Sequence, residues 1–125
     1  MGDAPLEGTV VVSVEQAVSA PLATRYLAEL GATVIKVERP EGDFARHYDS
    51  TVNGQATYFV WANRGKHSVV LDLKTPQGLA ALLDLASGAD VFVQNLAPDA
   101  AAGLGIDAAA IRVGHDALVA CDISG

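Results

Sequence analysis

The feature that most limits the fold of this chain is its alternation of short, β-branched apolar runs with segments of helical periodicity. Residues 9–14 (TVVVSV) form one such run, and residues 33–38 (TVIKVE) form the next. Large side chains between them recur at helical spacing and precede Gly31, which is placed to end a helix: Leu22, Tyr26, Leu27 and Leu30. This order predicts two parallel strands joined by a right-handed helical crossover.

The alternation continues towards the C-terminus. A third strand is expected over residues 67–73, followed by a helix with Thr75 as N-cap and Pro76 in its first turn. We expect the buried stripe of that helix to contain Leu79, Leu82, Leu83 and Ala86. A fourth strand over 90–95, a turn or short helix, a helix capped by Asp107 and a fifth strand over 117–125 complete the pattern. The prediction is an α/β fold with a Rossmann-like, mostly parallel sheet flanked by helices.

The segment between residues 40 and 66 has no sustained period and is punctuated by glycine and asparagine. We expect one helical turn around residues 56–64 within it. Three aromatic side chains in this turn are expected to lie in the core or an interface: Tyr58, Phe59 and Trp61. Cys121, within the fifth apolar run, is expected to be a buried thiol.

Charge and residue types exclude several classes of function. The chain has 125 residues, enough for one domain, and its formal net charge of −7 argues against a nucleic-acid partner. The single cysteine fits a reducing compartment, and neither a signal peptide nor an apolar run of membrane-spanning length is found, so we expect a cytoplasmic protein without a membrane partner. The three histidines are far apart and lack metal-ligand spacing, so no metal site is expected.

Most of the cations are concentrated in one part of the chain. Of eight lysines and arginines, six lie between residues 36 and 74: Lys36, Arg39, Arg46, Arg64, Lys66 and Lys74. Arg39 and Lys74 follow the second and third predicted strands, at the sheet edge where open α/β folds bind ligands. Positive charge there suits a phosphate or a carboxylate. The alternative is a solvated face on which Lys36 and Glu38 are ordinary surface charges, and the residues alone leave both interpretations open.

Two other features of the same edge have alternative interpretations. Glu38 stands where dinucleotide-binding folds place a ribose-binding acid, but the stretch after the first strand, EQAVSAPLAT, contains none of the glycines that such folds require. We therefore expect no NAD. The turn from Asn95 to Pro98 follows the fourth strand and either cradles a ligand or is a plain asparagine-initiated turn.

Four sequence blocks in a fixed order resemble the class III (CaiB/BaiF-type) coenzyme A transferase family, which also includes α-methylacyl-CoA racemases. The first block includes LGATVIKVERP at residues 30–40, and the second includes NRGKHSVVLDLKTP at residues 63–76. The third is ADVFVQNLAPDAAAGLGI and the fourth is LVACDISG, so the resemblance covers essentially the whole chain.

The resemblance implies an enzyme that moves CoA from an acyl-CoA to a small carboxylic acid. It implies a Rossmann-like large domain, a smaller domain, an interlocked homodimer, and CoA along the carboxyl edge of the sheet. Arg39 would lie beside the CoA phosphates, which would explain the concentration of cations. The other positions that match family CoA contacts are Val18 and Ser19 after the first strand, Leu71, Asp72, Leu73 and Lys74 near the adenosine, and Asn95, Leu96 and Ala97 after the fourth strand.

The chain departs from the family pattern at three places. Ala20 stands where many members have glycine, and Gly103 stands where many have arginine. The family's catalytic aspartate and small domain would lie beyond residue 125, so we expect these residues to be the N-terminal part of the large domain and inactive alone. Asp72 and Asp122, on predicted strands, are expected at ligand-edge or structural positions, and Glu38 is expected to pair with a cation. A racemase and a non-catalytic binding or assembly module remain as alternatives.

Overall fold

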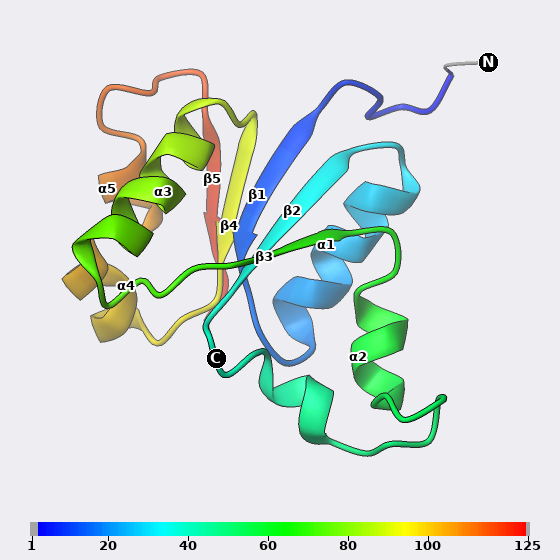
Figure 1. Cartoon of the computed structure of the whole chain (residues 1–125). Coiled ribbons are helices and arrows are strands. Elements are labelled where there is room, and N and C mark those ends of the chain that lie inside the picture. Colours follow the sequence, from blue (N-terminus) through cyan, green and yellow to red (C-terminus); the bar gives the residue numbers. More distant parts are fainter. Residues whose placement is uncertain (1–2, 125) are drawn as a thin grey trace.

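The computed structural model describes residues 3–124, which form a five-stranded parallel sheet between two layers of helices (Figure 1). The strand order is β3-β2-β1-β4-β5, and every neighbouring pair is parallel. The strands are β1 (Val10–Val14), β2 (Thr33–Glu38), β3 (His67–Val70), β4 (Val91–Gln94) and β5 (Val119–Asp122). The predicted α/β class, the parallel sheet and its five strands are thereby confirmed.

Helices cover both faces of this sheet. α1 (Ser19–Glu29) and α2 (Thr57–Ala62) lie on one side, and α3 (Pro76–Ser87), α4 (Pro98–Leu104) and α5 (Ala108–Ile111) lie on the other (Figure 1). Alternate β1 residues point to opposite faces of the sheet. Val11 belongs to the hydrophobic cluster that contains Ala20 of α1, and Val12 belongs to the cluster that contains Leu82 of α3. The three central strands, β2, β1 and β4, are therefore largely buried on both faces, as strands of parallel sheets normally are, whereas the edge strands β3 and β5 are mostly exposed.

Two helix boundaries follow from local chemistry that the sequence predicts. The Thr75 hydroxyl accepts a hydrogen bond from the Gly78 N–H at 3.0 Å, and Pro76 occupies the first turn of α3. Gly31 follows the last residues of α1 with a φ of 106°, a left-handed conformation that glycine adopts without strain. Both the N-cap of α3 and the glycine stop of α1 are confirmed.

The predicted buried stripe of α3 is partly wrong. Leu82 and Ala86 are buried and Leu79 is half-buried, but Leu83 is 43 % exposed because it lies on the outer side of the helix. The stripe therefore follows every fourth residue of α3 and leaves its outer side in solvent.

Three further predictions need correction. Cys121 is exposed, because β5 is an edge strand in the described chain and the outer side of this strand has no covering element there. Of the two predicted locations for the α2 aromatic residues, the core is excluded for Tyr58 and Trp61, which are 52 % and 42 % exposed, and the interface stays a prediction. β3 ends at Val70, so that Asp72 lies in the turn before α3 and not on a strand. Of the predicted fifth strand, Gly125 lies outside the described residues.

The irregular middle segment contains two short helical pieces. The predicted turn near residue 60 is α2, and a 3₁₀-helix, η1 (Phe44–His47), precedes it without having been predicted. Asp43 caps η1 by accepting the Ala45 N–H at 2.9 Å. Within residues 3–124, no helix has the length and apolar character needed to cross a bilayer.

Candidate functional site

A cavity of about 420 Å³ opens at the carboxyl edge of the sheet, beyond the ends of β1 and β2. Its walls come from the residues after β1, the loop after β2, the turn between β3 and α3, and helix α4. Open parallel sheets bind ligands at this edge, close to the point between β1 and β4 where α1 and α4 leave towards opposite faces of the sheet (Figure 1).

Cationic side chains line this cavity from two different segments. Arg39 follows β2, and its Nε donates a hydrogen bond to the Gly42 carbonyl at 2.9 Å. Its guanidinium also lies 4.3 Å from the centre of the Phe44 ring. The Glu41 carboxylate, which also lines the cavity, lies 4.0 Å from the Arg39 Nε, and the hydrogen bonds among residues 3–124 leave the Arg39 Nη atoms without a protein acceptor. Lys74 is exposed at the same cavity. The arrangement offers two cations to a bound anion, one of them held by a stacking contact.

Apolar side chains from three segments also line this cavity. Leu73 comes from the turn after β3, Leu96 follows β4, and Leu104 comes from the end of α4. The Asp72 carboxylate accepts the Lys74 N–H at 3.0 Å and so fixes the turn that carries both Leu73 and Lys74. A ligand with a flat apolar group and separate negative charges matches this combination of surfaces.

A second cavity lies beside the first and shares Leu96 and Ala97 with it. Ser19 and Asn95 line this second cavity, together with Pro98, Ile123 and Ser124. The Asn95 side chain accepts the Gln16 N–H and donates to the Gln16 carbonyl, both at 2.9 Å. Asn95 therefore holds the loop after β1 against the turn after β4, a structural role beyond the plain asparagine-initiated turn considered from the sequence.

The structure brings most of the predicted site residues to these two cavities. Arg39, Asp72, Leu73 and Lys74 line the first, Ser19 and Asn95 line the second, and Leu96 and Ala97 line both. Val18 and Leu71 line neither. Val18 precedes α1 and accepts the Leu22 N–H, and the Leu71 N–H donates to the Glu38 carbonyl at 3.0 Å.

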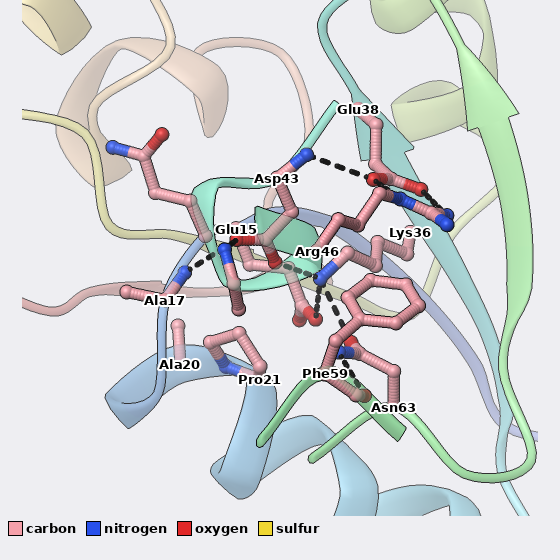
Figure 2. Close-up of polar contacts among 12 residues, drawn as sticks. Glu15, Ala17, Ala20, Pro21, Lys36, Glu38, Asp43, Arg46, Phe59 and Asn63 are labelled. Carbon is pink, nitrogen blue, oxygen red and sulfur yellow. Dashed lines mark hydrogen bonds and ion pairs between the residues drawn. The ribbon is translucent and has the colours of Figure 1, made fainter. Parts of the chain in front are cut away.

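Lys36 and Glu38 are buried, which overturns the interpretation of both as surface charges. Lys36 is 1 % exposed, and its ammonium contacts Asp43 at 2.6 Å, Asn63 at 2.7 Å and Glu15 at 3.3 Å (Figure 2). Because two carboxylates and an amide oxygen surround it, the desolvated cation has compensating charge and acceptors.

Lys66 belongs to the same buried network. Its ammonium contacts the Glu15 carboxylate at 2.5 Å, the Pro21 carbonyl at 2.7 Å and Asn63 at 3.0 Å. Burial lowers the pKa of Lys66 to about 8, although the attraction of Glu15 opposes the shift. Glu15 also accepts from the Thr24 hydroxyl, so this carboxylate joins β1, α1 and the segment before β3.

Glu38 forms an ion pair, as predicted. Its carboxylate accepts two hydrogen bonds from Arg46, at 2.8 and 2.7 Å, as well as bonds from the Asp43 N–H and the Ser68 hydroxyl. Burial acts to raise the pKa of Glu38, but the hydrogen bonds from Arg46 and Ser68 outweigh it and lower this pKa to about 2. With its oxygens occupied in this way, Glu38 is not placed as a free ribose acceptor.

The concentration of cations therefore does not have a single cause, because three of the six cations are paired with buried carboxylates. Lys36, Arg46 and Lys66 offset the buried carboxylates of Glu15, Asp43 and Glu38. Arg39 and Lys74 face the cavity. Sequence reasoning missed Glu15 and Asp43, although Lys36 between Ile35 and Val37 was a signal: a lysine inside an apolar strand needs a buried acid.

Between residues 3 and 124, no group of three or more histidine, cysteine, aspartate or glutamate side chains is arranged to hold a metal ion.

Comparison with known proteins shows the relationships of the chain. Residues 6–125 match the family described as CoA-transferase family III. A succinate–glutarate CoA-transferase of Agrobacterium fabrum is 39% identical over 97% of this chain and 32% of its own length. The human succinyl-CoA:glutarate CoA-transferase is 36% identical over 97% of this chain and 28% of its own length.

Solved structures have the same fold. A crystal structure of a hypothetical protein from Mycobacterium tuberculosis superposes with a TM-score of 0.91 at 38% identity, over 100% of this chain and 35% of that chain. A CaiB/BaiF family protein from Brucella suis gives a TM-score of 0.88 at 34% identity, over 97% of this chain and 33% of that one. The chain thus spans about a third of the length of these relatives.

Proposed function

The chain belongs to CoA-transferase family III, and we propose that it is the CoA-binding part of an acyl-CoA:carboxylate CoA-transferase. The observation that carries the proposal is the cavity that is lined by the cations Arg39 and Lys74 together with leucine side chains. CoA combines phosphate groups with a flat adenine, so its charge and its apolar surface match the two parts of this cavity.

In the proposed binding mode, residues from different parts of the two cavities contact different parts of CoA. Arg39 binds a CoA phosphate with the Nη atoms that its contacts with Gly42 and Phe44 leave available. Lys74 adds a second positive charge, and Leu73 and Leu96 contact the adenine. Ser19, Asn95 and Ala97 line the path of the remaining ligand in the second cavity. Val18 and Leu71, which line neither cavity, support the binding residues from behind and make no proposed contact.

The proposed reaction is covalent catalysis by an aspartate. Its carboxylate attacks the acyl-CoA carbonyl, so that a mixed anhydride forms and CoA leaves as the thiolate. The thiolate then attacks the aspartyl carbonyl and releases the first carboxylic acid, leaving an aspartyl-CoA thioester. The second acid, as its carboxylate, attacks this thioester, so that a new mixed anhydride forms and CoA leaves again as the thiolate. The thiolate then attacks the carbonyl of the new acyl group, which yields the new acyl-CoA and releases the aspartate carboxylate. We place this aspartate outside residues 1–125.

The domain organisation that we propose is based on the relatives, which are about three times as long as this chain. Residues 1–125 are the N-terminal part of the large domain, and the remaining two thirds supply the nucleophile and a small domain. The active protein is proposed to be a cytoplasmic, interlocked homodimer. Its acids are proposed to be small carboxylates, because the two CoA-transferase relatives are named for succinate or succinyl-CoA and glutarate.

The test is a transfer assay on the complete protein and on residues 1–125. Each is incubated in D₂O with succinyl-CoA and 2-methylacyl-CoA, with and without glutarate or oxalate, and the CoA esters are identified by mass spectrometry. We expect transfer only with the complete protein and only when an acceptor acid is present. Deuterium entering the α-carbon of the 2-methylacyl-CoA without an acceptor would identify a racemase instead. Transfer by residues 1–125 alone would show that the nucleophile lies within them, and Asp72 and Asp122 would then be replaced first.

A further inference from the structure

Asp43 is a buried acid in the lining of the first cavity, and its carboxylate also holds a neighbouring loop. We propose that Asp43 is a positioning residue that holds the loop after β1 in the conformation that forms a wall of both cavities. The proposal rests on the CoA-binding function proposed above, and it concerns a group that acts through the backbone of Ala17.

The contacts of Asp43 join three separate segments. One carboxylate oxygen accepts the Ala17 N–H at 2.8 Å, and the other accepts from the Lys36 ammonium at 2.6 Å (Figure 2). The first of these oxygens also accepts the Ala45 N–H at 2.9 Å. The Asp43 N–H in turn donates to the Glu38 carboxylate at 3.0 Å. Asp43 is only 2 % exposed, so these contacts are shielded from water and strengthened by their surroundings.

The loop after β1 needs such a constraint. Ala17 has a φ of 65°, a left-handed conformation that residues with a Cβ avoid. Such a conformation persists only where the surrounding structure imposes it. Asp43 binds Ala17 from one side, and Asn95 binds both backbone groups of Gln16 from the other.

The position of this loop decides the shape of the binding edge. Gln16 lines the first cavity and Ser19 lines the second, so residues on either side of Ala17 form a wall of each. A loop held before the ligand arrives loses less conformational freedom on binding, and this raises affinity without a new contact. The buried Lys36 and Asp43 therefore contribute to ligand binding through the loop.

Two paired substitutions separate the loop contact from the buried charges. Asp43→Ala alone would leave the Lys36 ammonium unpaired in the interior, so Lys36→Met is added to remove the cation together with the acid. Asp43→Asn with Lys36→Met is the rescue pair, because the amide oxygen can still accept the Ala17 N–H. Asp49→Ala is the matched control: Asp49 also accepts two backbone N–H groups, from Thr51 and Thr57, but it is exposed and lines neither cavity.

The experiment measures amide hydrogen exchange by NMR and CoA affinity by calorimetry on the whole 125-residue chain. For Asp43→Ala with Lys36→Met we expect exchange at Ala17 to become faster and CoA binding to weaken, each by about ten-fold or more, since the lost bond leaves the strained loop free. For the rescue pair and for Asp49→Ala we expect both values within about three-fold of the wild type. Unchanged exchange at Ala17, or faster exchange with unchanged CoA affinity, would overturn the proposal.

A further measurement on the wild-type chain covers the case in which the double variant with Asp43→Ala does not fold. A scalar coupling through the hydrogen bond between the Ala17 nitrogen and the Asp43 carboxyl carbon supports the contact, and its absence overturns it. A wild-type chain that binds no CoA would contradict the proposed function instead, while the exchange rates and the coupling would still decide whether Asp43 holds the loop.

Discussion

At the scale of single residues, the chemistry at the carboxyl edge of the sheet depends on which charged side chains are buried and which are exposed. Lys36 and Arg39 both belong to the six cations between residues 36 and 74. Lys36 is only 1 % exposed, whereas the side chain of Arg39, three positions later, is 46 % exposed. Sequence reasoning could place Arg39 at the ligand edge because it follows a predictable strand. It could not find the partners of Lys36, because Glu15 and Asp43 approach it only after three separate segments have packed together.

The first prediction concerns Arg39. Arg39→Ala should weaken CoA binding by roughly ten- to a hundred-fold, because a charge-assisted contact to phosphate is lost. Calorimetry on the chain measures the effect. Arg64→Ala is the control, because Arg64 is exposed, lines neither cavity and changes the net charge by the same amount. Equal CoA affinities for Arg39→Ala and Arg64→Ala would show that Arg39 does not contact CoA.

The second prediction concerns Glu38 and acid stability. Its pKa is about 2 in the folded chain and 4.5 as its ordinary value, so the unfolded chain binds the proton more readily. The stabilisation by Glu38 is therefore complete above pH 4.5 and is lost as the pH falls towards 2. Because Arg46 is partly exposed, we expect about 1–3 kcal/mol at neutral pH.

Urea unfolding from pH 7 to pH 3 tests this prediction. Glu38→Gln should lower the free energy of unfolding at pH 7, and its difference from the wild type should shrink below pH 4.5. The control, Glu41→Gln, alters a side chain that is 67% exposed and should show no such trend. A difference between wild type and Glu38→Gln that stays constant down to pH 3 would contradict the assigned ion pair.

At the scale of elements, strands with two neighbours are the most predictable. The predicted bounds of β2, residues 33–38, match the structure because its apolar, β-branched residues pack within the sheet. β3 and β5 are edge strands in the described chain, and both are shorter than predicted. The helix expected after Asp107 spans only Ala108–Ile111, and the Asp107 side chain makes no capping hydrogen bond, while the Ala108 N–H donates to Asp122. η1 depends on the cap by Asp43, which carries no periodic signal.

The third prediction concerns the close packing of α3 on the turn that precedes it. A Cβ at Gly78 would lie 1.9 Å from the Asp72 carbonyl oxygen, so Gly78→Ala must displace the turn that carries Leu73 and Lys74. We expect a loss of about 1–3 kcal/mol in unfolding free energy, together with weaker CoA binding. Gly103→Ala is the matched helical control, because nothing lies within 4 Å of its Cβ, and it should be neutral or stabilising by up to about 1 kcal/mol.

Thermal unfolding and a CoA titration of both variants check this third prediction. A Gly78→Ala chain as stable as Gly103→Ala would show that the helix can move away from the turn without cost. A destabilised Gly78→Ala chain with unchanged CoA affinity would show that the turn does not contribute to the binding edge.

At the scale of the whole molecule, the sheet gathers residues that are far apart in the sequence. Arg39, Lys74 and Leu96 belong to three different connections, and the parallel order brings these connections to one edge. The sequence could predict this convergence because the carboxyl ends of parallel strands share an edge. It could not predict that Asn95 and Asp43 clamp the loop after β1, since such contacts depend on how the loops pack.

The measurement that tests the central claim most directly is an NMR titration of the wild-type 125-residue chain with CoA and, separately, with NAD. We predict saturable shifts for CoA at the amides of Arg39, Lys74, Asn95 and their neighbours, becoming weaker with added salt because ions screen the attraction between the cations and phosphate. NAD should give no saturable shift at millimolar concentration, because the loop after β1 has no glycine where a pyrophosphate would approach. Absence of saturable shifts with CoA, shifts confined to another surface, or equal binding of NAD would contradict the account.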